Sequence, residues 1–178
     1  MLYPLKFRPR FFEKMWGGRK MQTLLGKNLP ADKPIGESWE LFDFPPGVVE
    51  NSTGWLSSEV ANGSLAGTSL HELVGRFGAE LMGDVKLVAP HGQFPVLIKF
   101  LDAKDDLSVQ VHPDEKYAAE HPDAHLKTEA WYVLQHDPGS KIYKGLCEGM
   151  TTSLSLNMNN ALGLCSRTLV STTKCLVM

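Results

Sequence analysis

The sequence contains little cysteine, and none of it is arranged for metal binding. Only three of the 178 residues are cysteine, all of them lie after position 146, and no two are spaced as in a C-x-x-C motif. A cysteine-based metal site is therefore not expected. We predict that Cys147, Cys165 and Cys175 are reduced bystander thiols.

Long apolar runs and an excess of one charge are also missing. No apolar stretch approaches the roughly 20 residues that a membrane span needs. The N-terminal MLYPLKFRPRFF carries charges inside its apolar stretch and no small-residue cleavage site. The net charge is −2, with Lys and Arg spread among acidic residues, which gives no basic patch for nucleic acid. We expect no membrane and no nucleic-acid partner, and the cytoplasm is the default location.

What is present indicates a folded protein with a core. The residues are 43% hydrophobic and 21% charged, which is typical of a globular chain rather than a disordered one. Small anionic substrates fit this composition, because a few local cations are enough to hold a phosphate group.

The apolar patterning is mostly that of strands. Alternation or continuous apolar character, bounded by Gly, Pro, Asn and Asp, recurs along the chain. The run at 94–103 is nearly all apolar, as in a strand buried on both faces. Strands joined by tight turns favour an antiparallel sheet rolled into a barrel or sandwich. The predicted strands span residues 36–44, 94–103, 107–113, 129–135 and 141–146.

Two helices stand out against this background. Leu70 to Met82 has apolar residues at helical spacing, with Ser69 and Glu72 placed as a capping box and Gly83 as a stop. We predict an amphipathic helix that packs on the rest of the protein. A second, short helix is expected over residues 114–120.

Four polar residues near the middle of the chain form the candidate site. Gln110 and His112 lie two apart on an alternating strand, so their side chains leave the same face, and Lys127 and Glu129 are related in the same way. If the two segments are neighbours, one patch presents nitrogen and oxygen ligands of the kind that a catalytic zinc uses. Taken singly, each residue also fits a surface strand or turn.

Several separated motifs resemble those of the type I phosphomannose isomerases in their shorter bacterial form. FPVLIKFLDAKDDLSVQVHPDEKYA followed by HLKTEAWYVL is similar to the signature region of that family. MWGGRKM and IGESWEL are similar to its opening, in the same order and spacing. The resemblance covers roughly residues 5–146. It implies a cupin-like jelly-roll β-barrel with zinc in its mouth, and interconversion of mannose 6-phosphate and fructose 6-phosphate.

The resemblance also implies a role for particular residues. Three correspond to zinc ligands. The two catalytic candidates are a lysine that lines the substrate cavity and a lysine beside the ligand Glu. The two substrate-binding candidates are a residue in the N-terminal motif that borders the site and a serine near the sugar phosphate. In that order they are Gln110, His112 and Glu129; Lys99 and Lys127; Trp16 and Ser108. Trp16 also fits a packing role, and Lys99 fits a side chain that reaches from an apolar strand to the rim.

The end of the sequence departs from the family pattern. The family supplies a further histidine ligand and an arginine from later strands, but no histidine follows His136 here and the only later arginine is Arg167. Residues 151–178 contain no acid, and neither strand nor helix periodicity persists. We therefore predict the N-terminal part of the family domain over 1–149, incomplete as a barrel, in a chain truncated relative to the family. Residues 150–178 are predicted to be an atypical tail, disordered or frameshifted.

Two other functions fit the same residues. A non-catalytic cupin module that binds a sugar phosphate would use Lys99 and Ser108 and would not need metal. A different metal-dependent cupin, such as an oxygenase or another sugar-phosphate isomerase, would draw on a histidine-rich cluster. A Gln-Val-His pattern stands in its place here, which favours the mannose enzyme. Zinc stoichiometry distinguishes the module from the enzyme.

Overall fold

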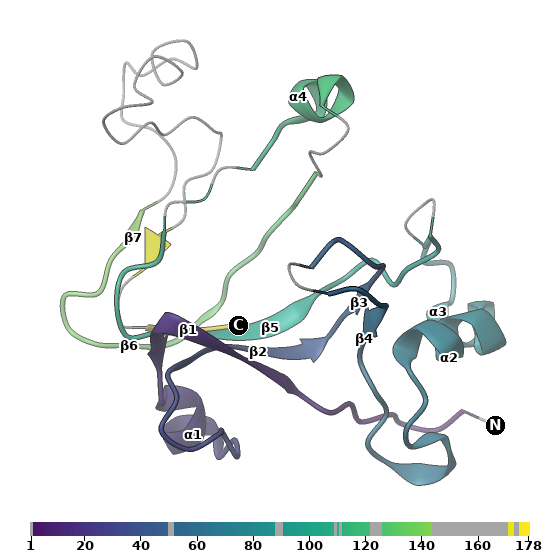
Figure 1. The fold of residues 1–178 in the computed structure, drawn as a ribbon, viewed down its shortest axis with the longest axis horizontal. Coiled ribbons are helices and arrows are strands. Elements are labelled where there is room, and N and C mark those ends of the chain that lie inside the picture. The colour runs from purple at the N-terminus through teal and green to yellow at the C-terminus, as the bar shows by residue number, and fades with distance from the viewer. Residues whose placement is uncertain are drawn as a thin grey trace.

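The protein is mainly β, with a few short helices. The computed structural model describes residues 2–49, 52–87, 91–108, 110, 112–121, 126–143, 171–172 and 175–178. A five-stranded antiparallel sheet of order β1-β2-β5-β9-β6 forms its centre, and β3–β4 and β7–β8 form two small ladders (Figure 1). The strands are β1 Arg10–Gly18, β2 Ile35–Leu41, β3 Asp43–Phe44, β4 Leu56–Ser57, β5 Ile98–Ala103, β6 Val133–His136, β7 Ile142–Tyr143, β8 Ser171–Thr172 and β9 Cys175–Val177. The helices are α1 Lys20–Leu25, α2 Leu70–Phe77, α3 Ala79–Met82 and α4 Glu115–Glu120, with a 3-10 turn at Gly63–Leu65.

The three strands β1, β2 and β5 carry the core on both of their faces. The adjacent Phe11 and Phe12 point to opposite faces and join two different apolar clusters. One cluster is centred on Met21 and Ile35, which are 0% and 2% exposed, and the other on Trp39. Burying a side chain such as Met21 or Ile35 contributes roughly 1.5–3 kcal/mol, so this part of the sheet is the stable platform of the molecule.

Helix α1 is capped from a distant strand rather than by its own sequence. Its N-cap residue, Arg19, makes no side-chain cap. Instead Asp102 of β5, 1% exposed, accepts a hydrogen bond from the backbone N–H of Met21 at 3.2 Å and another from the backbone N–H of Lys20. The first N–H groups of a helix need such acceptors. Asp102 therefore fixes α1 against the sheet.

A buried carboxylate, that of Asp43, connects β3, β4, α2 and the segment that leads into β5. Asp43 in β3, with its side chain fully buried, accepts hydrogen bonds from the Trp55 indole N–H at 2.6 Å and from the Phe94 backbone N–H at 2.9 Å. Asp43 also contacts His71 Nδ1 in α2, at 3.3 Å, and the His71 ring packs against Trp55 at an interplanar angle of 37°. These bonds join β3, β4, α2 and the approach to β5.

The predicted helix at 70–82 is present but interrupted. Ser69 and Glu72 form the expected capping box, and Gly83 ends the segment. The prediction of one continuous helix is wrong at Gly78, whose φ of 46° lies in the left-handed region and separates α2 from α3. The sequence pattern missed this break because the apolar spacing continues across it.

The strand predictions were accurate near the core and too long elsewhere. Residues 36–44 form β2 and β3, while the run at 94–103 becomes a strand only from Ile98, where it meets β2. The segment at 129–135 is paired as β6 only from Val133. Among the described residues of 107–113 there is no named strand, and Val109, Val111 and the predicted strand end at Leu146 lie outside the described residues. The short helix at 114–120 is confirmed as α4.

Barrel closure is not seen. In the part of the chain that the structure describes, the sheet is open, because β1 and β6 stand at its two ends and are not paired with each other. The same part of the chain has no helix that is both long enough and apolar enough to cross a bilayer.

Candidate metal and sugar-phosphate site

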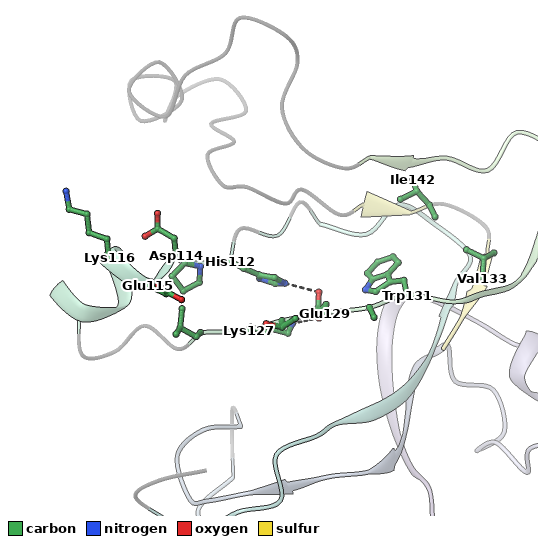
Figure 2. Close-up of a pocket in the computed structure, with 13 residues that line it drawn as sticks. His112, Asp114, Glu115, Lys116, Lys127, Glu129, Trp131, Val133 and Ile142 are labelled. Carbon is green, nitrogen blue, oxygen red and sulfur yellow. Dashed lines mark hydrogen bonds and ion pairs between the residues drawn. The ribbon is translucent and has the colours of Figure 1, made fainter. Parts of the chain in front are cut away.

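The candidate site is an open cavity of about 820 Å³ at the side of the sheet that carries β6. It lies between the segment that follows His112, including α4, and the extended segment that leads into β6 (Figure 2). The cavity combines titratable groups at one end with apolar groups at the other. Its lining includes His112, Asp114, Glu115, Lys116, Lys127, Glu129, Trp131, Val133 and Ile142.

His112 and Glu129 point toward each other across the cavity. His112 Nε2 lies 2.8 Å from Glu129 Oε2, and the two side chains are 15% and 17% exposed (Figure 2). The other carboxylate oxygen of Glu129 accepts a hydrogen bond from Lys127 Nζ at 2.5 Å. The structure thus brings together three of the four residues that the sequence placed in one patch.

Local structure explains the position of each member of this group. Pro113 follows His112 and disfavours a helical conformation there. The carboxylate of Asp114 then caps α4 by accepting a hydrogen bond from the Tyr117 N–H at 2.8 Å. Lys127 and Glu129 are two residues apart in an extended segment, so their side chains lie on one side of it.

The charge state of Glu129 suits a ligand. Burial on its own raises the pKa of Glu129, but the hydrogen bonds from Lys127 and with His112, together with their charges, outweigh it, and the pKa lies below its ordinary value. Glu129 is therefore ionised at neutral pH. A carboxylate must be ionised to bind a metal ion.

The remaining candidates do not converge on this pair in the described structure. The side chains of Gln110 and Ser108 are exposed and are not among the residues that line the cavity. Lys99 of β5 pairs with Glu37 of β2 at 3.4 Å, on the central sheet. Trp16 of β1 packs against Leu101 in the core. Among the described residues, no three His, Cys, Asp or Glu side chains gather into a metal-binding group.

Trp131 is a cavity residue that was not singled out from the sequence. Trp131 lines the cavity beside Glu129 (Figure 2). It also packs, as Trp16 does, against Leu101, which is 7% exposed. It links the site to the core sheet. The signal was available, because Trp131 stands two residues after Glu129 in an extended segment and so shares its side.

The fold and the site define a mainly β protein with an imidazole–carboxylate pair in an open cavity. The chain belongs to the type I phosphomannose isomerases, since the family model for their catalytic domain matches residues 4–148. It is 39% identical over 145 residues to the mannose-6-phosphate isomerase of Streptococcus mutans, covering 82% of this chain and 41% of that protein. It is 39% identical over 147 residues to the probable mannose-6-phosphate isomerase GmuF of Bacillus subtilis, covering 82% and 42%.

A solved structure agrees with these relatives. The crystal structure of the mannose 6-phosphate isomerase from Bacillus subtilis superposes with a TM-score of 0.75 at 30% sequence identity, covering 98% of this chain and 56% of that chain. The chain thus spans about two fifths of the length of the curated relatives that it matches.

Proposed function

We propose that this chain is a zinc-dependent isomerase that interconverts mannose 6-phosphate and fructose 6-phosphate, built on a cupin-type barrel. The observation that supports this most directly is the His112–Glu129 pair at the cavity, in a chain of the phosphomannose isomerase family. Gln110 is the third proposed zinc ligand.

The donor set fits zinc in chemistry and nearly in geometry. Imidazole nitrogen and carboxylate oxygen are both common zinc ligands, and two ligands of one tetrahedral zinc stand about 3.3 Å apart. The observed separation of 2.8 Å requires His112 and Glu129 to part by about half an ångström. Gln110 must turn from its exposed position toward the pair to complete three protein ligands. Zinc bound there would act as a Lewis acid on the sugar oxygens at C1 and C2.

The protein's own side chains supply the rest of the proposed site. Lys127 holds Glu129 in its ionised form and, when the carboxylate engages a metal, its ammonium becomes available to bind a substrate oxygen that gains charge in the enediol-type intermediate. Lys99 is the second proposed catalytic lysine, after release from Glu37. Trp16 and Ser108 are the proposed contacts to the sugar phosphate.

Replacement of Glu129 tests the metal assignment. Glu129→Gln keeps the size of the side chain but removes the charge, and we expect at least about a hundredfold weaker zinc binding and a parallel loss of isomerase activity. Zinc per chain and mannose 6-phosphate turnover are measured together, with and without chelator. Glu120→Gln, an exposed acid at the far end of α4, is the matched control and should keep both. Full zinc binding by the Glu129 variant would refute the assignment.

A non-catalytic sugar-phosphate-binding module is the second candidate. The exposed position of Gln110 favours it, because only two of the three proposed ligands meet at the cavity. Such a module would bind mannose 6-phosphate equally well with and without chelator and would show no turnover. Chelator-sensitive turnover would exclude it.

A further inference from the structure

Within the described residues, the segment that carries Glu129 is hydrogen-bonded to the core sheet through a strand from the far end of the chain. Strand β6 is hydrogen-bonded to β9, and β9 is hydrogen-bonded to β5, so β9 stands between the two. Among the described strands, β6 has no pairing with β5 itself. Asp102 of β5 and Gln135 of β6 both lie opposite Leu176, one on each side of β9.

The pairing continues past β9 toward the site. The Tyr132 N–H donates to the Met178 carbonyl at 2.9 Å, and the Met178 N–H donates to the Tyr132 carbonyl at 2.9 Å. This reciprocal pair is the narrow ring of an antiparallel ladder. It lies next to Trp131 and three residues from Glu129.

We propose that residues 175–178 position the catalytic segment: β9 and Met178 hold residues 129–136 in register with β5, and thereby place the Glu129 carboxylate opposite His112. The role resides in the backbone, because both hydrogen bonds to Tyr132 come from the main chain of Met178, while the Met178 side chain is 47% exposed. The proposal rests on the proposed function only for its catalytic consequence, since the strand pairing is independent of metal.

Side-chain contacts also attach the same segment to the core. Trp131 packs on Leu101, and Lys20 Nζ of α1 pairs with Asp137 at 2.8 Å, just after β6. A partly exposed ion pair contributes at most about 1 kcal/mol. Both contacts are made by side chains, so they restrain position without setting the register, which in a sheet is fixed by backbone pairing.

Substitution of Met178 by proline or by alanine distinguishes the contribution of its backbone N–H from that of its side chain. Met178→Pro removes the N–H that bonds to Tyr132, whereas Met178→Ala keeps it. Amide hydrogen exchange, read by mass spectrometry, is followed in peptides covering 126–136 and, as an internal reference, 10–18 and 35–41. We expect about tenfold faster exchange at 126–136 in Met178→Pro, unchanged exchange in the reference peptides, and wild-type exchange throughout in Met178→Ala.

Deletion of Met178 is a second variant that controls for backbone strain caused by the proline ring. It removes both hydrogen bonds to Tyr132 and introduces no ring. It should reproduce the local effect. Unchanged exchange at 126–136 in both variants, an equal effect of Met178→Ala, or a uniform rise in all peptides in both variants would overturn the proposal.

Zinc binding gives the functional arm of the same experiment. The proline and deletion variants should bind zinc at least about tenfold more weakly than Met178→Ala, because Glu129 is no longer held opposite His112. Local exchange that rises while zinc affinity stays at the wild-type value would overturn the positioning role. Absence of zinc binding in the unaltered protein would instead count against the proposed function, and the exchange result would still decide the strand pairing.

Discussion

Replacement of Asp102 should loosen α1 and lower the stability of the whole core. The carboxylate is 1% exposed and accepts hydrogen bonds from the backbone N–H groups of Met21 and Lys20, which would otherwise be unsatisfied at the start of the helix. Hydrogen bonds to a charged acceptor contribute about 1.5 kcal/mol or more each, and part of this is offset by relief of the buried charge. We expect Asp102→Ala to lower the free energy of unfolding by about 2.5 kcal/mol and Tm by about 5 to 10 °C.

The pH dependence of the effect has a definite sign. Burial raises the pKa of Asp102, against the opposing effect of the Met21 and Lys20 N–H groups. The native carboxyl therefore holds its proton more tightly than the unfolded one. Its contribution to stability is complete below the ordinary aspartate pKa of about 3.9 and decreases as the pH rises through the raised native pKa. Asp102→Asn keeps an acceptor and does not titrate, so its stability relative to wild type should improve as the pH rises from about 3.5 to 7.

Urea denaturation of the three proteins across this pH range tests both statements, because subtraction from wild type cancels the other titrating groups. Asp105→Ala is the matched control: this acid lies in the turn after β5, is exposed, and should change stability by less than about 0.5 kcal/mol. An Asp102→Ala variant as stable as the control would refute the capping argument. A difference between Asp102→Asn and wild type that is constant with pH would refute the raised pKa.

Two further substitutions probe the packing that supports the site. Asp43→Ala should destabilise the protein by about 2–4 kcal/mol in urea, because it leaves the partly buried Trp55 indole and Phe94 backbone donors without their acceptor, and an unchanged midpoint would contradict this. Gly18→Ala should also destabilise, by about 1–3 kcal/mol, since its Cβ would come within 2.4 Å of the buried β5 carboxylate. Gly54→Ala is its control, because a Cβ at position 54 meets nothing within 4 Å. Equal melting temperatures for the two variants would show that the contact between a Cβ at position 18 and the Asp102 carboxylate does not destabilise the protein.

The sequence predicted best the features that are encoded locally. The capping box of Ser69 and Glu72, the short helix α4 and the strand at 36–44 all follow from residues within one turn or one strand of each other. The break at Gly78 was missed because a glycine within a helical pattern is compatible with continuation as well as interruption.

Features set by distant contacts were not predictable in this way. The Asp102 cap joins β5 to a helix 81 residues earlier, and no local pattern marks it. Likewise, residues 175–177 have no sequence periodicity of their own, and they form a strand because β5 and β6 offer backbone partners on both sides. In the site, the motif indicated His112, Lys127 and Glu129 as neighbours, and these are the residues that the structure brings together. The same motif placed Gln110 with them, but its side chain is exposed and is not among the residues that line the cavity.

His112 is held in place by residues close to it in the sequence, whereas Glu129 is held by residues far from it. Family membership of the matched region therefore covers the contacts of the first residue but not all contacts of the second. His112 is fixed locally, by the proline that follows it and by the Asp114 cap of α4. Glu129 is placed by its attachment through Trp131 and β6 to strands that lie far away in the sequence. A match over residues 4–148 includes both donors and the local support of His112, but it does not include β9. The two proposed ligand residues thus lie in the matched region, whereas β9, which we propose to set the distance between them, lies outside it.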